Sequence, residues 1–512
     1  MTEAVPTQPA RRSVSWRPVL RRVITHPATW IALGAFALYA FYALCRWPQF
    51  LPAGYDLGIF DQVVRSYAHF QAPIVSLKGD DFNIFGDHFH PILALLAPLY
   101  WVWDDPRILL IAQAALVAAS TVWVYRFADR RMVTLGVPRR ALAIVITLIY
   151  ALGWPIQAMI DFDFHEIAFA IPLLAWAMDA YDRHSDRELL IAAGILLLVR
   201  EDMGAIVFML GLLRVFRKPR WPGVAMMLVG LLVFALVVGV VIPAFAANGY
   251  AYWNYSVLGA SAGDAVHTLL TRPGDVLVAL VTPTTKLVTL IALLAPLLAL
   301  PLLSPLSLIA LPILVQRFLA DREALWGVTY HYNAPVWIIF TLAAIDGLAR
   351  LLGWLPRADT ATGRRTLAIV LIGIMAVVPV AGTVIRATNT EGLFPFGRML
   401  SAQAWKQTPH ILSQAASIGD IPPGTCVAVD DRLAPRLLRT NHVTVPGVSA
   451  HEPDYYVIDS YYERPATTPA NWTTTETLDH ALSLGYTVIA EHGTVLVLRS
   501  PAYAGPTARC GS

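Results

Sequence analysis

Charged side chains are scarce in this sequence. Asp, Glu, Lys and Arg make up 14% of its 512 residues, whereas 56% of the residues are hydrophobic and the mean hydropathy is +0.56. A chain with so little charge cannot cover itself with a polar surface, so most of it is expected to lie in a lipid bilayer. The formal net charge of +3 is also too small to indicate binding to nucleic acid.

Cysteine is rare, and the common catalytic signatures are missing. Cys45, Cys426 and Cys510 are too few and too far apart for a disulfide framework. Cys426 and Cys510 could pair if the C-terminal part of the chain lies in an oxidising compartment. The sequence has no P-loop, dinucleotide fingerprint, zincin motif or nucleophile elbow, which argues against nucleotide-driven chemistry in the cytosol.

Long apolar runs dominate the chain instead. A spanning helix needs about 20 mostly apolar residues, and the runs predict an all-α polytopic transmembrane domain with about eleven spans and short broken helices. This domain is expected over residues 29–386, after a basic segment over residues 1–28 that lacks a cleavage signature. The expected spans are residues 29–47, 106–127, 139–157, 166–181, 189–200, 203–216, 221–244, 281–298, 302–319, 334–354 and 366–386.

Clusters of arginine and lysine decide the orientation, because cytoplasmic loops are enriched in positive residues. These clusters lie in the N-terminal segment and within residues 126–140, 214–220 and 350–365. The loop over residues 48–105 is rich in aspartate and is therefore placed outside. We expect a multi-pass plasma-membrane protein with a cytoplasmic N-terminus, and an odd number of spans leaves residues 387–512 extracytoplasmic.

Residues 189–213 could form one helix with Arg200, Glu201 and Asp202 at its centre. Each charge there would cost about 2.5–3.5 kcal/mol on insertion scales. Two half-length helices that meet at a charged turn avoid this cost, and the turn should then line a cavity or be buried in protein. The planar guanidinium of Arg200 would suit a phosphate, although a purely structural Arg–carboxylate pair is the alternative.

The aspartate-rich loop contains Asp56 and, further on, Asp87-His88-Phe89-His90-Pro91. The proline favours extended chain before it, with both histidines on one side. The two histidines are either solvated loop residues or, with Asp87, candidate ligands of a divalent metal ion. Such a metal site would need further ligands from elsewhere in the chain.

Two more outer segments carry histidine. In the stretch Asp161-Phe162-Asp163-Phe164-His165-Glu166, alternation would place Asp161, Asp163 and His165 on one face. Alternatively, Asp163 caps the next helix and the phenylalanines lie in the membrane interface, but a functional role is favoured for His165 and Glu166. In Tyr330-His331-Tyr332 the tyrosines are more typical of interfacial anchors, so His331 is the site candidate.

These segments resemble an uncharacterised bacterial membrane-protein family, domain of unknown function 2079. In that family the histidine before the second short helix is usually followed by Ser-Pro, whereas here His90 is followed directly by Pro91, so His90 inherits no family role. A lysine often stands in the family where this chain has Arg200. The matching segments are Asp56-Leu57-Gly58-Ile59-Phe60-Asp61-Gln62, Asp87-His88-Phe89-His90-Pro91, Phe164-His165-Glu166, Arg200-Glu201-Asp202, Tyr330-His331-Tyr332 and Pro453-Asp454-Tyr455.

The family in turn looks like a distant relative of the GT-C glycosyltransferases, which take sugars from polyprenyl phosphates outside the cytosol. By this resemblance Asp56 deprotonates an acceptor hydroxyl for inverting attack on the anomeric carbon, and Arg200 stabilises the leaving lipid phosphate. The resemblance concerns the fold, which does not determine function. The expected catalytic residues are Asp56, His165 and Glu166, and the expected substrate-binding residues are Asp61, Gln62, His88, Arg200, Glu201, Asp202, Tyr330 and His331.

After residue 386 the pattern changes to that of a small α/β domain. Asp430 and Asp431 follow its first expected strand, and helix capping or solvation is favoured for them over binding of a sugar acceptor. Helices are expected over residues 398–416 and 474–484, strands over residues 426–429 and 455–458, and a hairpin over residues 486–490 and 494–499 that turns near His492-Gly493.

The leading hypothesis is a membrane glycosyltransferase that moves a sugar from a polyprenyl-phosphate donor to a cell-envelope glycan, lipid or protein. Its expected partners are the bilayer, this donor and this acceptor, with no nucleic acid among them. Buried charge in broken helices is also typical of transporters, so a transporter or lipid-sugar flippase is the main alternative, although the spans show no internal repeat. A non-catalytic envelope assembly protein is the third.

Overall fold

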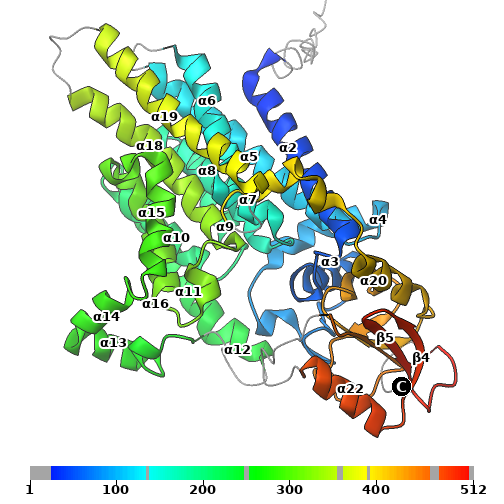
Figure 1. Ribbon diagram of the computed structural model, residues 1–512. Coiled ribbons are helices and arrows are strands. Elements are labelled where there is room, and N and C mark those ends of the chain that lie inside the picture. The colour runs from blue at the N-terminus through cyan, green and yellow to red at the C-terminus, as the bar shows by residue number, and fades with distance from the viewer. Residues whose placement is uncertain are drawn as a thin grey trace, which may run out of the picture.

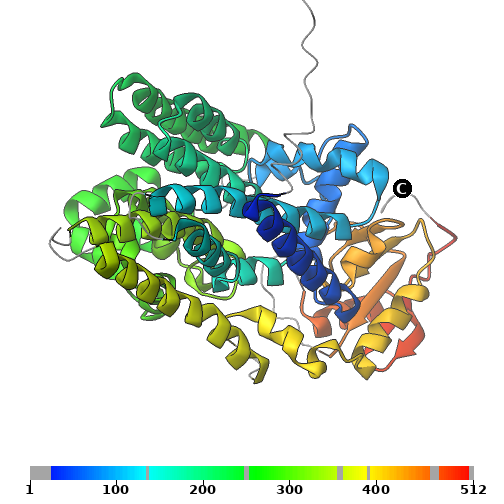
Figure 2. The same ribbon diagram turned by 90° about the horizontal axis from the view of Figure 1, so that it is seen from above.

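The structure is a bundle of helices with a small sheet and its covering helices packed against one end (Figures 1 and 2). The computed structural model describes residues 25–133, 138–246, 253–354, 361–388, 392–461 and 472–506. The basic cluster before residue 25 and Cys510 lie outside these ranges. Below, the C-terminal region means the described residues from 392 onward.

Five helices of the described chain are long and apolar enough to cross a membrane. A sixth span results if α6 (Arg139–Ala151) and α7 (Trp154–Asp161), which meet at an angle of 43°, cross as one bent unit. The five are Pro27–Gln49, which contains α2 (Pro27–Arg46); Arg107–Val133, which is α5; Trp221–Phe245, which contains α11 (Trp221–Leu236) and α12 (Ile242–Phe245); His331–Trp354, which contains α18 (Ala334–Trp354); and Thr362–Thr388, within α19 (Ala361–Thr388).

The expected count of about eleven spans is therefore not confirmed. Hydropathy counts the apolar residues of a run but not the breaks within it, and Pro296, Pro301 and Pro305 interrupt the run over residues 281–319 with short 3₁₀ turns. The apolar runs that fold into helices shorter than a span are α8 (Ala170–Asp182), α9 (Asp186–Leu196), α10 (Met203–Val215), α15 (Thr285–Leu294) and α16 (Leu311–Leu319).

The charged turn lies between two half-length helices, as predicted. Residues 197–202 form the turn that separates α9 from α10. Glycine lets α10 lie directly against α11, since a Cβ on Gly211 would come within 2.6 Å of the carbonyl oxygen of Gly223. Close approach through small residues is a common form of helix packing in membranes, and here it supports the helix that presents the turn.

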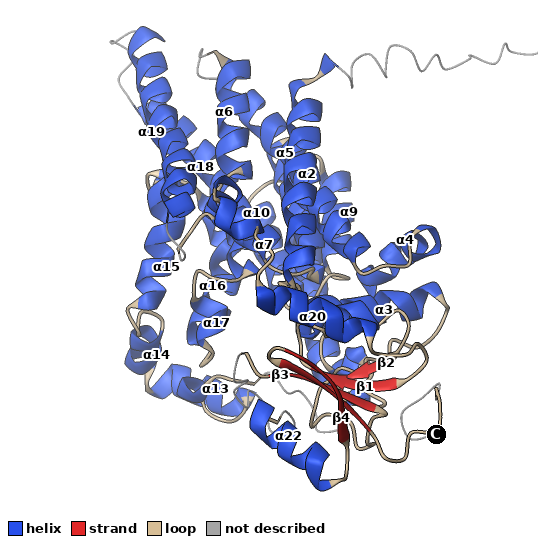
Figure 3. Cartoon of the chain, turned by 45° about the vertical axis from the view of Figure 1, so that its right-hand side comes forward, coloured by secondary structure: helices blue, strands red, loops and turns tan. Residues whose placement is uncertain are grey.

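The C-terminal region contains a five-stranded sheet in the order β2-β1-β3-β5-β4 (Figure 3). β1 is parallel to β2 and β3, whereas β5 is antiparallel to β3 and β4. Helix α20 (Pro409–Gly419) packs against β4 and β5, and α22 (Thr474–Ser483) packs against β3. The strands are β1 (Cys426–Val429), β2 (His442–Thr444), β3 (Tyr455–Asp459), β4 (Thr487–His492) and β5 (Val495–Arg499).

Most of this region follows the predicted pattern, with two differences. Strand β2 has three residues, too few for alternation to reveal it. The helix expected over residues 398–416 is broken, because 3₁₀ turns precede α20, which begins at Pro409. Cys45 is a free thiol and Cys426 is disulfide-bonded, while Cys510, its expected partner, lies outside the described residues.

The outer segments connect the bundle to the sheet. One continuous apolar core includes Leu57 and, from β1, Val427, and the hydroxyl of Ser76 donates to the carbonyl oxygen of Val443 in β2, 2.5 Å away. The aspartate-rich loop is therefore held against the C-terminal region.

The helices not yet named are short. They are the π-helical turn Gly54–Gly58, α3 (Ile59–Ala68), α4 (Ala97–Val102), α13 (Ala262–Thr271), α14 (Pro273–Ala279), α17 (Glu323–Trp326) and α21 (Ala434–Leu437).

Candidate active site

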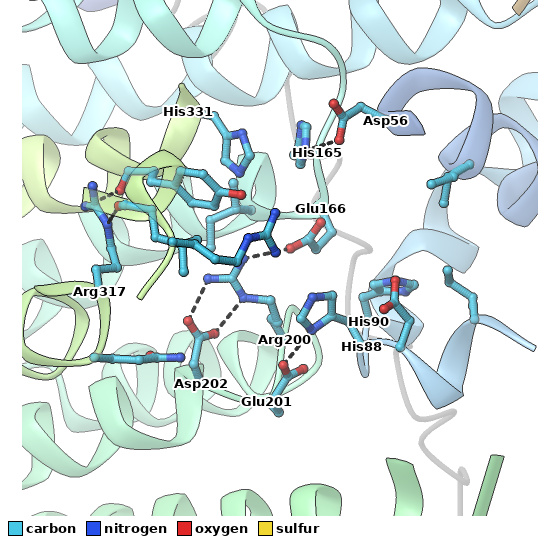
Figure 4. Close-up of a pocket in the computed structure, with 18 of the residues that line it drawn as sticks. Asp56, His88, His90, His165, Glu166, Arg200, Glu201, Asp202, Arg317 and His331 are labelled. Atoms are coloured by element: carbon cyan, nitrogen blue, oxygen red, sulfur yellow. Dashed lines mark hydrogen bonds and ion pairs between the residues drawn. The ribbon is translucent and has the colours of Figure 1, made fainter. Parts of the chain in front are cut away.

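A cavity of about 1030 Å³ opens between the helical bundle and the aspartate-rich loop. Most of the residues singled out from the sequence line it, and Figure 4 shows them converging from separate elements. The lining includes Asp56, Asp87, His88, His90, His165, Glu166, Arg200, Glu201, Asp202 and His331.

Asp56 and His165 form a pair on the cavity wall. Oδ1 of Asp56 lies 2.9 Å from Nε2 of His165, and Nδ1 of His165 lies 3.1 Å from the carbonyl oxygen of Asp163. A carbonyl only accepts, so Nδ1 carries a hydrogen, and the proton between Nε2 and Oδ1 belongs to an imidazolium–carboxylate or an imidazole–carboxylic acid pair. Burial lowers the pKa of His165, but the charge and hydrogen bond of Asp56 together with the charge of Glu166 outweigh burial and raise the pKa, which favours the imidazolium form of His165.

His331 stacks on His165, with ring centroids 3.7 Å apart and ring planes at 28°. Phe162 lies 5.5 Å from the ring of His331 and 5.2 Å from that of His165. His331 is 2% exposed, and its Nδ1 has no hydrogen-bond partner among the described residues. These contacts fix the plane of the His165 ring, so the outer turn and the start of α18 together orient the imidazole toward Asp56.

Arg200 lies at the centre of a network of carboxylates (Figure 4). Its Nε and Nη2 donate to the two oxygens of Asp202 at 2.9 and 2.6 Å, and its Nη1 donates to Oε1 of Glu166 at 3.2 Å. Both carboxylates are buried, so their charges depend on this guanidinium. The edge of the Arg200 guanidinium that could bind two phosphate oxygens binds the two oxygens of Asp202 instead. The role of Arg200 in this structure is therefore to neutralise buried carboxylates.

His88 and Glu201 form a second ion pair on the cavity wall. Nδ1 of His88 lies 2.7 Å from Oε1 of Glu201, and the backbone N–H of Phe89 donates to the other carboxylate oxygen at 3.1 Å. Burial lowers the pKa of His88, but the charge and hydrogen bond of Glu201 outweigh burial and raise the pKa to about 9. The pair therefore joins the aspartate-rich loop to the charged turn at neutral pH.

We expect the stability of the protein to fall above neutral pH through this pair. The pKa of folded His88, about 9, exceeds its ordinary value of 6.5. The stabilising contribution is therefore complete below about pH 6.5 and is lost as the pH rises through about 9. The measurement is Tm in detergent between pH 6 and pH 10. The fall should be smaller in His88→Gln, which has no charge to lose, and parallel curves for the two proteins would contradict the assignment.

The candidate metal ligands do not converge. Asp87 lies 2.5 Å from Nζ of Lys78, His88 is paired with Glu201, and Nδ1 of His90 has no hydrogen-bond partner within the described residues. No group of three or more His, Cys, Asp or Glu residues in the described part of the chain is placed to hold a metal ion. These donors therefore do not fit a divalent cation.

Arg317, near the end of α16, lines the cavity and was missed in the sequence. Its guanidinium donates to the carbonyl oxygens of Leu325 and Tyr332 and to Oδ1 of Asn333, at 2.5, 2.7 and 2.9 Å. It is 6% exposed and has no carboxylate partner among the described residues. A buried positive charge without an anionic partner is costly, so Arg317 is the better candidate for binding an anion.

Other predicted residues have structural partners outside the cavity lining. Asp61 accepts hydrogen bonds from Arg65 and from the hydroxyl of Tyr100, and the side-chain amide of Gln62 donates to the hydroxyl of Ser76. The ring of Tyr330 contacts that of Phe162. Neither Asp61, Gln62 nor Tyr330 has a part in the site proposed below.

The three side chains predicted to share one face, those of Asp161, Asp163 and His165, have different partners. Asp161 pairs with Arg398, and Asp163 accepts from Arg46 at 3.1 Å and from the backbone N–H of Ala53 at 2.7 Å. Only His165 contacts Asp56. The two aspartates therefore hold the ends of neighbouring segments together.

A family of predicted membrane proteins matches most of the chain. The family described as "Predicted membrane protein (DUF2079)" matches residues 46–497. Among curated proteins, none matches the chain. Two crystal structures of ArnT from Cupriavidus metallidurans are similar at 13% identity: the one bound to undecaprenyl phosphate covers 94% of this chain and 100% of its own, with a TM-score of 0.48, and the apo one covers 91% and 98%, with a TM-score of 0.40.

Proposed function

The chain belongs to the DUF2079 family of predicted membrane proteins, and we propose that it is an inverting glycosyltransferase that takes a sugar from a polyprenyl phosphate. The acceptor is a glycan, lipid or protein of the cell envelope. The observation that carries the proposal is the presence, in one cavity, of the Asp56–His165 pair and of Arg317, a buried arginine without a described acidic partner.

The geometry of the cavity supports a reaction with two organic substrates. Figure 4 shows Asp56 and Arg317 at separate edges of the cluster, with His331 and His165 between them in this view. The volume of about 1030 Å³ is at the upper limit of ordinary small-molecule sites, which measure about 300–1000 Å³, so a donor sugar and an acceptor fit together. A phosphate near Arg317 would place the sugar it carries between the two edges of the cluster.

In the proposed reaction, the carboxylate of Asp56 takes the proton of an acceptor hydroxyl as the acceptor oxygen forms its bond to the anomeric carbon. The bond between that carbon and the phosphate oxygen breaks, and its electron pair remains on the lipid phosphate. The guanidinium of Arg317 stabilises the added negative charge. The hydrogen bond from His165 keeps the carboxylate of Asp56 oriented before the proton is transferred.

The extracytoplasmic position of this site is also a proposal. Its support is the positive-inside bias of the basic loops and the excess of aspartate in the loop that carries Asp56. The disulfide bond of Cys426 adds to it, because such bonds persist mainly in oxidising compartments. The site and Cys426 then lie on the same, outer side of the membrane.

The test is transfer by the purified protein in lipid nanodiscs, with radiolabelled polyprenyl-phosphate sugars and envelope glycans or lipids as acceptors. We expect transfer to an acceptor, or slow release of sugar to water when no acceptor is added. A nucleotide sugar serves as the control donor and should be inert, since the chain has no nucleotide-binding motif. Movement of the lipid across proteoliposomes without release or transfer of sugar would contradict the enzyme and favour the flippase.

A further inference from the structure

The segment before Asp56 is held by the C-terminal region. The backbone N–H of Gly54 donates to the carbonyl oxygen of Asp431 at 2.8 Å, and that of Tyr55 donates to Oδ1 of the same residue at 2.6 Å. With the bond from Ala53 to Asp163, three consecutive backbone amides have fixed acceptors directly before the base. Two of these acceptors belong to one residue almost 400 positions later in the sequence.

The contact around these hydrogen bonds is closely fitted. A Cβ on Gly54 would lie 2.8 Å from Cβ of Ala434 and 3.0 Å from Oδ1 of Asp431, so only glycine fits there without a shift. The guanidinium of Arg436 lies 3.6 Å from the ring centroid of Phe50. The residues after β1 therefore follow the segment that leads to Asp56 over several residues, and the contact does not depend on one hydrogen bond.

Asp431 also lies at the edge of the sheet where parallel α/β sheets usually bind ligands. It follows the carboxyl end of β1, which lies between the parallel strands β2 and β3. In open α/β sheets, ligands bind outside the carboxyl ends of parallel strands at the point where the strand order reverses. Here the backbone of Gly54 and Tyr55 lies at that edge, in the place where such a sheet usually binds a ligand.

We propose that Asp431 is a positioning residue for Asp56, and that the C-terminal region completes the active site by fixing the backbone that carries the base. The catalytic part of this inference rests on the proposed function, whereas the structural part does not. Asp56 is 29% exposed at its side chain, and its backbone lies in the π-helical turn Gly54–Gly58 directly before α3, where the first backbone amides of a helix have no acceptor within the helix. Acceptors outside the turn must supply its rigidity.

Hydrogen–deuterium exchange on the full-length protein in nanodiscs tests the structural part. In Asp431→Ala the amide of Tyr55 loses its side-chain acceptor and should exchange faster, whereas the amide of Gly54, whose acceptor is the backbone carbonyl oxygen of residue 431, should change less. Asp431→Asn, which keeps a side-chain oxygen acceptor, should restore slow exchange at Tyr55. Asp454→Ala is the matched control, because Asp454 accepts the backbone N–H of Cys426 at the opposite end of β1. Unchanged exchange in Asp431→Ala would overturn the proposal.

The catalytic part is tested by steady-state transfer kinetics on the same proteins. We expect Asp431→Ala to lower kcat about 30-fold with little change in donor KM. This is less than the about 100-fold cost of a 1 Å misplacement, because Asp163 still holds Ala53 and the backbone carbonyl of residue 431 still holds Gly54. Asp431→Asn should recover most of kcat. An unchanged kcat in Asp431→Ala would overturn the positioning role.

Two further results keep the inference separate from other failures. If Asp431→Ala does not fold, Gly54→Ala is used instead. Its added Cβ would push the segment away from Ala434, so it should give the same faster exchange and lower kcat. Wild-type exchange and wild-type kcat in Gly54→Ala would overturn the proposal. A wild-type protein without transfer activity, combined with faster exchange in Asp431→Ala, would refute the proposed function while supporting the hold on the segment.

Discussion

Asp56→Asn is expected to lower the rate of sugar transfer about 1000-fold, within the range of about 10²–10⁴ that a general base contributes. Asparagine has nearly the same shape and can still accept from Nε2 of His165, but it cannot take a proton from an acceptor hydroxyl. The loss should appear in kcat, with donor KM little changed, because Asp56 acts on the acceptor and not on the lipid phosphate. Radiolabelled transfer under donor-saturating conditions measures the effect.

The control for this experiment is Asp81→Asn, the same substitution at an exposed aspartate of the same loop that does not line the cavity. Its kcat should equal that of the wild type. His165→Gln should lower kcat by less than Asp56→Asn, because the carboxylate remains and only its orientation suffers. If Asp56→Asn keeps more than about a tenth of the activity, general base catalysis by Asp56 is contradicted.

Some of this site could be predicted from the sequence because the membrane makes isolated charge expensive. Arg200, Glu201 and Asp202 in an apolar stretch had to break the helix or be buried with partners, and the structure shows both. The same reasoning, together with the sidedness of the loops, placed Asp56 and His165 on one face of the membrane. Their contact in the structure is consistent with that placement.

What could not be predicted depends on contacts distant in the sequence. The role of Asp431 follows from the way the C-terminal region packs against Gly54, and no local pattern distinguishes this aspartate from its neighbour Asp430. The expected number of spans was not confirmed for a related reason. Whether an apolar run with prolines makes one long helix or several short ones depends on the helices around it, which supply partners for the freed backbone groups.

Arg317 was missed although the sequence contained a signal for it. An arginine within an expected span, residues 302–319, breaks the same rule that drew attention to Arg200. Arginine side chains near the ends of membrane helices usually reach the membrane surface. The structure shows Arg317 instead turned onto two carbonyl oxygens and one amide oxygen, which orient a guanidinium but do not cancel its charge.

Arg317→Met is therefore expected to weaken binding of polyprenyl phosphate about 100-fold. Truncating one partner of a buried, hydrogen-bonded charge pair costs about 2–5 kcal/mol, and the phosphate would lose a buried arginine that has no carboxylate partner among the described residues. Arg317→Lys should lose less, because the charge remains while the planar fork is absent. Isothermal titration of the protein in nanodiscs with polyprenyl phosphate measures the effect.

The free polyprenol, which has no phosphate, separates loss of charge from loss of fold. Removing Arg317 also leaves the carbonyl oxygens of Leu325 and Tyr332 without their donors, so some destabilisation is expected in Arg317→Met. A folding defect would weaken binding of the polyprenol and of its phosphate alike, whereas loss of an anion site weakens only the second. Equal affinity of wild type and Arg317→Met for the phosphate would show that the anion binds elsewhere.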